Sequence, residues 1–466
     1  MLLDHHAEAY KDDDRDDVLA FLPNLKGKRV LELAAGIGRF TEPLASRGAS
    51  RVLATDFVES FLEKNRELNG HLANVELQLV DATAMEHEPS SWDMVFTNWL
   101  LMYLTDEETA ALVMAWLKWL TPGGHVHVRE SCSQPMDIEF NASGDNESDE
   151  LNPTYYRHSS VYQRLFESAR WLEDGRLYRF RVLWARPVPT YVRVYKSWRQ
   201  VHWLLRKELS PDDLDVGRQN SLTSSDLAPK LGGEWLQRQA AVDEVFGTAS
   251  ALESPVARIL VEALKTSDEK LRADSRLLLL LSPMDEGSHF VSLGLGAEVF
   301  RRELSCLVTA VESDPWLFRC HQDVACRRGD TGLLYHWAPH RAFGGGTAAA
   351  STPEALLPLV GCCDAAAAFA IVRTPDAARK LAPLIGALKT IAGGERKLRL
   401  HVAVLDVSGS EQLRSDRVGV WTKAVKDEIQ GLSAVRVEKV DDSAVAAVKK
   451  FSRTTAVEFQ NQLCVA

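Results

Sequence analysis

The chain has 466 residues, of which 45% are hydrophobic and 26% are charged, and its formal net charge is -11 at pH 7. This length predicts two or three domains of about 100–200 residues each, with enough apolar side chains for a sizeable core. The acidic balance excludes a protein that coats nucleic acid or anionic membrane by bulk charge, although it leaves room for a local basic pocket.

The N-terminus shows no secretion signal. Met1-Leu2-Leu3 is followed directly by Asp4, without the basic and apolar regions of a signal peptide. The longest apolar block, at 277–281, is far shorter than the ~20 residues that span a bilayer. The seven cysteines are scattered and form no CxxC pair. We therefore expect reduced thiols in a cytoplasmic protein.

The first motif that carries chemistry is "RVLELAAGIGRF", residues 29–40. Its start predicts a buried parallel strand, and Phe40–Arg47 predicts the helix that follows. Between them, Gly36 and Gly38 let the backbone approach a ligand closely. A dinucleotide fingerprint would need a third glycine three residues later, and Thr41 stands there instead.

An acid, Glu32, stands before these glycines at the end of the strand. The order acid-x-G-x-G-x-G resembles motif I of class I S-adenosylmethionine (SAM) methyltransferases, with Ala34 in place of the first glycine. The resemblance implies that Glu32, Ala34, Gly36 and Gly38 line the site of the SAM cofactor.

Two further strands are predicted to end at this site. "RVLATDF" ends in Asp56 and Phe57, and an acid at this place can accept both ribose hydroxyls. "VELQLVDATAM" ends in Asp81 and Ala82, where such methyltransferases fix the adenine amino group.

A fourth strand, "WDMVFTNWL", brings Asn98 and Trp99 toward the cofactor. A helix, a Pro-Gly-Gly turn and a fifth strand follow in "WLKWLTPGGHVHVRE". This series of strands and helices predicts an α/β fold, and the resemblance to class I SAM methyltransferases implies a Rossmann-like domain with a mostly parallel seven-stranded sheet.

A more specific resemblance rests on "NWLLMYL", "RESC" and "NPTYYR", which the general SAM fold does not require. With these motifs, residues 3–207 resemble the N-terminal catalytic domain of phosphoethanolamine N-methyltransferases of the plant and nematode type. The nematode type with an active N-terminal domain starts phosphocholine synthesis by adding the first methyl group to phosphoethanolamine. The resemblance implies this activity, with phosphoethanolamine as the small-molecule substrate.

Residues 155–199 are chemically suited to a substrate that carries a phosphate dianion. A phosphate needs charge-assisted donors, which Arg and Tyr side chains supply. The candidate substrate-binding residues are Tyr156, Arg157, Tyr162, Tyr191 and Arg129. For each of them, packing at the surface or in a half-buried position is the alternative. Packing is the expectation for Arg179, Arg181 and Arg186, which alternate along a strand-like run.

In the expected reaction, the substrate nitrogen attacks the sulfonium methyl group in line at ~3 Å. The amine must first lose a proton, since its ordinary pKa is ~10, like that of Lys. In single-domain relatives a Tyr–His pair orients the amine and accepts that proton. Tyr103 stands at the position of this His and, one helical turn after Trp99, shares its face. Tyr103 and Trp99 are thus the catalytic candidates, with helix packing as the alternative for Tyr103.

The Tyr of that pair would lie upstream of Met1 in the family layout, which favours a truncated chain. His5, His6 and Tyr10 are the nearby substitutes, and both histidines are expected to be solvated at the start of a helix. The acidic run 12–17 is expected only to suit a helix N-terminus.

The second half contains a partial internal repeat. Gly124 lies 31 positions after Asp93, and Gly394 correspondingly lies 30 positions after Asp364. "FVSLGLGAEVF" echoes the first glycine loop, and "LVTAVESD" repeats the second strand as far as Glu312.

The repeat lacks residues that the first half uses. Ser292 stands where the acid of the first strand is expected, and the Pro-Gly-Gly turn has become Ala392-Gly393-Gly394. We therefore expect a degenerate methyltransferase-like α/β domain, kept for packing or regulation. The alternative is a second active domain for later methylations.

Taken in order, the motifs predict a catalytic methyltransferase domain in 1–207, a linker with helices in 208–270, and the degenerate domain in 271–466. We expect a monomer with no metal, no nucleic-acid partner and no stable membrane insertion. Two other functions stay open: a SAM methyltransferase for another small acceptor, and an inactive SAM-binding or interaction protein.

Overall fold

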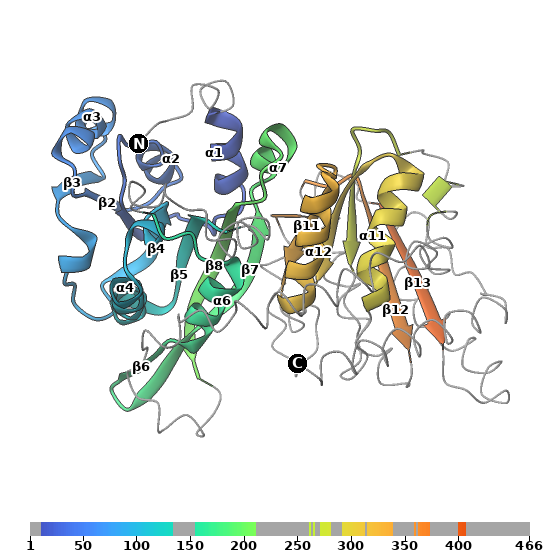
Figure 1. The fold of residues 1–466 in the computed structure, drawn as a ribbon. Helices are drawn as coiled ribbons and strands as arrows, with labels where there is room; N and C mark the ends of the chain where they lie inside the picture. The colour runs from blue at the N-terminus through green and yellow to red at the C-terminus, as the bar shows by residue number, and fades with distance from the viewer. Residues whose placement is uncertain are drawn as a thin grey trace, which may run out of the picture. The chain divides into compact units, whose positions relative to one another are not determined.

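The computed structural model describes residues 11–133, 154–210, 271–280, 291–312, 315–338, 362–372 and 399–406, with residues 261, 264, 265, 358 and 359. The chain divides into two compact units, Met1–Lys230 and Leu231–Ala466, both drawn in Figure 1. The expected linker at 208–270 falls almost entirely outside the described residues, so its helices stay a prediction.

The N-terminal unit is built on one mixed sheet with the strand order β3-β2-β1-β4-β5-β8-β7. Strands β1 to β5 are mutually parallel, whereas β8 pairs antiparallel with both β5 and β7. A short strand, β6, pairs with β7 outside this order. The strands are β1 (Arg29–Leu33), β2 (Arg51–Asp56), β3 (Val75–Leu79), β4 (Trp92–Asn98), β5 (Leu120–Ser131), β6 (Arg170–Glu173), β7 (Arg176–Pro187) and β8 (Gln200–Leu209).

Helices connect these strands as the sequence pattern predicts. Helix α2 contacts β2, α3 contacts β2 and β3, and α6 packs on β7 (Figure 1). Helix α4 begins with a capping box, in which the side chains of Thr105 and Glu108 each bond the backbone N–H of the other. The helices are α1 (Lys11–Leu19), α2 (Thr41–Ser46), α3 (Glu59–Asn69), α4 (Asp106–Trp119), α6 (Ser159–Ser168) and α7 (Pro189–Tyr195).

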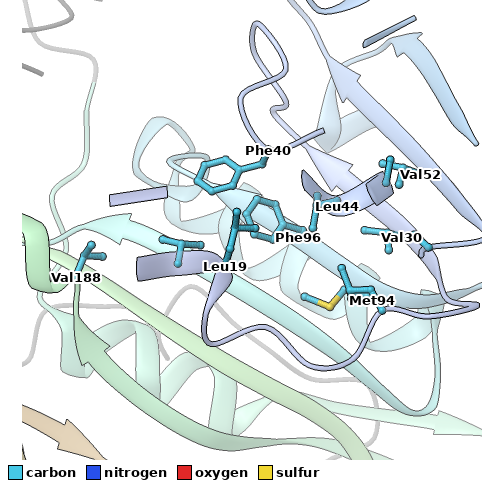
Figure 2. Packing of buried hydrophobic residues seen from close by; sticks show 12 residues of the cluster. Leu19, Val30, Phe40, Leu44, Val52, Met94, Phe96 and Val188 are labelled. Carbon is cyan, nitrogen blue, oxygen red and sulfur yellow. The ribbon is translucent and has the colours of Figure 1, made fainter. Parts of the chain in front are cut away.

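One face of the sheet is covered by α1 and α2. Figure 2 shows how Leu19 of α1 and Leu44 of α2 pack with Val30 and Phe96 of the sheet. Alternate residues of a strand point to the same face, so Val30 and Glu32 both face α2. The apolar packing therefore fixes α2 directly beside the carboxyl end of β1. The cluster comprises Val18, Leu19, Leu25, Val30, Phe40, Leu44, Ala45, Ala49, Val52, Met94, Phe96 and Val188.

The C-terminal unit repeats the strand order of the first. Its strands run β13-β12-β9-β10-β11 and pair in parallel, as do β5-β4-β1-β2-β3. The described elements are β9 (Arg276–Leu280), α11 (Val291–Leu304), β10 (Leu307–Glu312), α12 (Pro315–Arg328), β11 (Leu333–Trp337), β12 (Ala365–Val372) and β13 (Arg399–Asp406).

A hydrogen bond common to both units confirms that Asp93 and Asp364 correspond. The backbone N–H of Arg29 donates to Asp93 at 2.9 Å, and that of Arg276 donates to Asp364 at 2.8 Å. The fold is therefore two methyltransferase-like α/β units, as predicted.

The register of β9 corrects one alignment within this unit. Leu279 pairs with Ala310 on β10 just as Glu32 pairs with Ala54 on β2, so Leu279 occupies the place that Ser292 was expected to take. The backbone at Gly294 and Gly296 lies inside α11 and forms no loop. The error arose because glycines were matched without regard to the strand that precedes them. Residues 392–394 lie outside the described residues.

Candidate cofactor and substrate site

Two acids meet at the carboxyl ends of β1 and β2. Glu32 is 2% exposed, and its Oε2 accepts a hydrogen bond from Thr41 Oγ1 at 2.7 Å. Burial raises the pKa of Glu32 to about 8, while the bond from Thr41 opposes this shift and the charge of Asp56 adds to it. Asp56 accepts from the backbone N–H groups of Gly36 and Val58 at 2.8 and 2.9 Å. The second acid thus holds the glycine loop in place.

The glycine loop turns sharply between these acids. Ala34, Gly36 and Gly38 all have a left-handed backbone, with φ of 51°, 56° and 89°. A Cβ on Gly38 would lie 2.3 Å from side-chain atoms of both Asn65 and Asn69 in α3, so only glycine fits there. No atom comes within 4 Å of a Cβ placed on Gly36, which leaves its backbone open to a ligand.

A chain of hydrogen bonds ties this loop to α3. Asn65 donates to Thr41 Oγ1 at 3.1 Å, and Asn69 donates to the carbonyl of Gly38 at 3.0 Å and to Asn65 at 2.9 Å. Thr41 in turn donates to Glu32. The loop conformation is therefore set by buried polar contacts before any ligand arrives.

Apolar side chains stand exposed around the same edge. Ile37 of the glycine loop is 38% exposed, and Phe57, just after β2, is 74% exposed. Asp81 is exposed and caps the short 3-10 helix η2 (Ala82–Ala84) by accepting from Thr83 at 2.8 Å. Exposed apolar side chains beside acids that follow parallel strands suit a flat, partly polar group such as an adenosyl moiety.

Strand β4 delivers Asn98 and Trp99 to this edge. Asn98 Oδ1 is buried and has no hydrogen-bond partner among the described residues. Trp99 has a left-handed backbone with φ of 60°, and its indole Nε1 donates to Gln200 Oε1 at 2.6 Å. A bulky residue in this conformation is strained, and such strain concentrates at functional sites. Gln200 was not foreseen from the sequence.

Arg129, on β5, lies fully buried between two aromatic rings. Its Cζ is 4.5 Å from the ring centroid of Trp99 and 4.9 Å from that of Tyr191 in α7. Its Nη1 donates to Asp14 at 2.8 Å, and Asp14 also pairs with Arg39. Nε and Nη2 of Arg129 have no hydrogen-bond partner among the described residues. Two cations share one carboxylate here, which favours an incoming anion.

Tyr103 and Tyr156 stand partly exposed at this edge. Tyr103 ends the short helix η3 (Leu101–Tyr103) and is 43% exposed, and Tyr156 is 41% exposed. Burial, and next the nearby Tyr156 and Glu130, raise the pKa of Tyr103. The backbone N–H of Tyr155 donates to the carbonyl of Met102 at 2.6 Å, which brings the "NPTYYR" segment against the turn that carries Tyr103.

Two candidate substrate residues are turned into the protein. The guanidinium of Arg157 donates to Asp106 at 2.8 Å and to the carbonyls of Leu101 and Leu104 at 2.8 and 2.7 Å. Tyr162 is fully buried in α6. The geometry places Arg157 as a support for the turn and Tyr162 in the core, so a direct phosphate contact for either stays a prediction.

The acidic run in α1 has more than the solvated role that its sequence indicated. Asp14 is 4% exposed and pairs with Arg39 and Arg129, and Asp17 accepts from the backbone N–H and hydroxyl of Thr190 at 2.7 Å each. Nothing in the local pattern distinguishes these two acids from their neighbours. Asn65 and Asn69 were not expected at the site, but the sequence could have indicated them, because residues four positions apart lie on one face of a helix.

Arg179 and Arg181 pair with Glu208 on β8, and Arg186 stacks on Phe21, so these three arginines pack as expected. Within the described ranges, no group of three or more His, Cys, Asp or Glu side chains is placed to hold a metal ion. Nor does any helix there combine the length and apolarity needed to cross a membrane.

Comparisons with known proteins relate the chain to methyltransferases. A model of the methyltransferase domain matches residues 30–124. The chain is 43% identical over 244 residues to phosphoethanolamine N-methyltransferase 1 of Caenorhabditis elegans, covering 52% of this chain and 50% of that protein. It is 41% identical over 216 residues to phosphoethanolamine N-methyltransferase 3 of Arabidopsis thaliana, covering 46% of this chain and 42% of that protein. The chain thus spans about half the length of the curated relatives it matches.

A solved structure extends the likeness to both units. It is phosphoethanolamine N-methyltransferase 1 of Haemonchus contortus in complex with phosphoethanolamine and S-adenosylhomocysteine. It is 28% identical, with a TM-score of 0.67, over 98% of this chain and 88% of that one. These matches confirm the resemblance drawn from the motifs: the chain carries a class I methyltransferase domain, and it is similar to phosphoethanolamine N-methyltransferases of nematodes and plants.

Proposed function

We propose that this chain is a SAM-dependent N-methyltransferase that converts phosphoethanolamine to phospho-monomethylethanolamine, the first step toward phosphocholine. The observation that carries the proposal is Arg129, a buried cation with two unpaired donor nitrogens beside the edge where the glycine loop and acids lie. The two curated relatives reported above are named for this activity.

SAM is the proposed cofactor, and the residues of this edge fit it. Asp56 would accept hydrogen bonds from the ribose hydroxyls, Asp81 from the adenine amino group, and Phe57 and Ile37 would cover the adenine faces. The unpaired Oδ1 of Asn98 provides an acceptor for the methionine amino group. The cofactor would supply an electrophilic methyl group, and the protein would position the amine.

The phosphate would be held by Arg129, Tyr156 and Tyr191. Arg129 offers two donor nitrogens, and Tyr156 offers a hydroxyl. Tyr103 would accept a hydrogen bond from the amine. Its raised pKa keeps it a neutral phenol near pH 7, so it orients the nitrogen, and its exposure gives the released proton a route to water.

A substrate comparison tests the proposed activity. Donors that lose the phosphate stay buried and unpaired at a cost of ~1–3 kcal/mol each. Two or three such donors discriminate by about 10³-fold. Methyl transfer to phosphoethanolamine should therefore exceed that to free ethanolamine by about this factor in kcat/KM. Turnover of ethanolamine within tenfold of phosphoethanolamine would contradict the proposal and favour another small acceptor.

The phosphate contact of Tyr156 has its own test. Tyr156→Phe removes only a hydroxyl donor, so the KM for phosphoethanolamine should rise about tenfold while SAM affinity stays unchanged. Tyr178→Phe, in the buried part of β7, is the control and should leave the KM near that of the parent. An unchanged KM in Tyr156→Phe would remove Tyr156 from the substrate site.

The cofactor contact is tested at Asp56. Asp56→Asn keeps the shape but loses the charge, and SAM binding should weaken by ~1.5–3 kcal/mol, the value of hydrogen bonds to a charged group. Titration calorimetry measures this, with the exposed Asp16→Asn in α1 as the control. Equal SAM affinity in Asp56→Asn and the parent would show that β2 does not end at the ribose.

The cellular compartment and the oligomeric state of the enzyme are part of the same proposal. Cys306 and Cys362 are free thiols in the described parts of the chain, which supports a reducing, cytoplasmic setting. The proposed active form is a monomer, because every residue that the proposal uses lies in one unit of one chain. Size-exclusion chromatography with light scattering tests this form.

A further inference from the structure

The turn after β4 is held by a buried carboxylate. Glu130, on β5, is fully buried, and its Oε1 accepts from the backbone N–H groups of Leu100 and Leu101 at 3.1 and 2.8 Å. Its Oε2 accepts from the backbone N–H of Met102 at 3.2 Å. Three successive amides of the turn thus converge on one side chain.

The carbonyls of the same turn are held from the other side by Arg157. Nη1 and Nη2 of Arg157 donate to the carbonyls of Leu101 and Leu104, and Nε donates to Asp106 at the start of α4. Between the two charged groups, the backbone from Leu100 to Leu104 is fixed through both its donors and its acceptors. Tyr103 is carried on this backbone and projects from it, partly exposed.

This arrangement costs free energy that a short solvated turn would not cost. Burying a carboxylate away from water costs free energy, and the N–H groups of Arg157 are used to bond the backbone of the turn. Nothing in the sheet requires this, because β4 and β5 pair through their own backbones. This cost in free energy is explained if the function of the protein depends on the position of the turn.

We propose that Glu130 is a positioning residue for methyl transfer, which acts by fixing the turn that places Tyr103 against the substrate amine. This inference rests on the proposed function, in which Tyr103 orients the amine. A displacement of about 1 Å in a positioning group costs up to about 100-fold in rate. Glu130 touches neither substrate nor cofactor in this scheme.

Glu130 and Arg157 together form a clamp on the backbone of the turn from Leu100 to Leu104. The charge of Glu130 makes this clamp sensitive to pH. The titratable and charged groups that face it are Arg157, Tyr162 of α6, Tyr103 of the turn and the thiol of Cys132. Burial raises the pKa of Glu130 to about 7, while the three backbone N–H groups and Arg157 lower it again.

Protonation weakens the clamp and therefore the proposed activity. A proton on Oε2 takes the lone pair that faces the N–H of Met102, so the turn loosens as the pH falls through about 7. Stability changes in the opposite sense. The pKa of Glu130 is about 7 in the folded protein, and its ordinary value is 4.5. Between these values the folded state binds more protons than the unfolded state, so the contribution of Glu130 to the free energy of unfolding falls as the pH rises.

The test is Glu130→Gln in the full chain. Glutamine keeps the size but has one acceptor oxygen and an amide N–H2 group, so it resembles the protonated carboxyl permanently. We expect kcat for phosphoethanolamine to fall about 10- to 100-fold, with the dissociation constant for SAM within twofold of the parent. The fall in kcat of the parent with a midpoint near pH 7 should disappear in the variant. Glu86→Gln, an exposed glutamate paired with Lys118, is the control.

Hydrogen exchange gives a readout independent of turnover. The amides of Leu100, Leu101 and Met102 should exchange faster in Glu130→Gln, and faster in the parent at pH 6 than at pH 8 once intrinsic rates are divided out. A double variant with Tyr103→Phe should lose little more activity than the worse single variant, because both changes act through one group. If Glu130→Gln does not fold, Arg157→Lys releases the same turn from its other side.

Two results would overturn the inference: unchanged kcat with unchanged exchange in the folded variant, or full additivity with Tyr103→Phe. Failure of the proposed function looks different, since the parent would then not methylate phosphoethanolamine at any pH. In that case, unchanged exchange of the three amides in Glu130→Gln would still refute the clamp.

Discussion

Two residues other than glycine adopt the left-handed backbone at the carboxyl edge of the first sheet: Ala34 and Trp99, with φ of 51° and 60°. This conformation costs an L-residue ~1–2 kcal/mol. Trp99 is held by the bond from its backbone N–H to the carbonyl of Arg129 at 2.8 Å and by the bond from its indole to Gln200. Its strain is compensated by contacts that place its ring, whereas a methyl group at position 34 gains nothing comparable.

Ala34→Gly should therefore stabilise the protein. Glycine removes the left-handed cost and adds unfolded-state entropy, so the net gain is about 0.5–1 kcal/mol in the free energy of unfolding. Urea denaturation measures this gain. Ala35→Gly, at the next position and without a positive φ, is the matched control and should destabilise the protein. Destabilisation by both substitutions would show that the methyl group of Ala34 packs favourably.

At the level of secondary-structure elements, α1 is attached to the rest of the unit through its acids as well as through the apolar side chains of Val18 and Leu19. Asp14 joins it to Arg39 after the glycine loop and to Arg129 on β5, and Asp17 joins it to the start of α7. The helix thereby connects the cofactor edge with the proposed phosphate donors. Its stability matters for the position of Arg129 and not only for the helix.

Asp14→Asn should loosen α1 and disturb Arg129. Removing one partner of a buried ion pair costs ~3–5 kcal/mol, because the remaining charges stay buried without compensation. Hydrogen exchange should increase across α1, and the KM for phosphoethanolamine should rise. Asp13→Asn, one position away and exposed, should change stability by less than about 0.5 kcal/mol. A loss below about 1 kcal/mol for Asp14→Asn would mean that the pair is dispensable.

At the level of the whole molecule, two units share one strand order but differ at the residues that would bind SAM. Leu279 occupies the place of Glu32, while Glu312 keeps an acid at the place of Asp56. Burial lowers the pKa of His321 to about 3, so this residue, 4.0 Å from Glu312, is a neutral neighbour of that acid. An apolar side chain at the first position cannot take part in the polar network that fixes the first loop.

We therefore expect the C-terminal unit to be catalytically silent. A fragment ending at Lys230 should keep methylation of phosphoethanolamine if it stays in solution, and a fragment from Leu231 onward should bind no SAM by calorimetry. Circular dichroism of both fragments is the control for folding. Saturable SAM binding by the second fragment would show that it is an active domain, the alternative that its repeat first suggested.

Local pattern was sufficient for the first five strands and for the glycine loop between β1 and α2. Largely apolar runs of five to seven residues, which end at Leu33 in β1, Asp56 in β2 and Asn98 in β4, identify buried parallel strands, because both faces of such strands are covered. The carboxyl ends of parallel strands share one edge, so chain order places the candidate cofactor residues along that edge of the sheet. The same logic failed at Ser292, where glycines were aligned and the strand "RLLLL" before them was passed over.

The partners of the site residues depend on contacts between distant parts of the chain. Asp14 and Arg129 are separated by 115 positions, and Arg157 reaches the carbonyl of Leu101 across 56 positions. Sequence pattern suggests that an arginine is a donor, but it contains no information on which acceptors its N–H groups already bond. Burial and packing decide this, since they bring Asp14, Glu130 and Arg157 into buried positions, where each charge must be compensated by the groups that the fold places beside it.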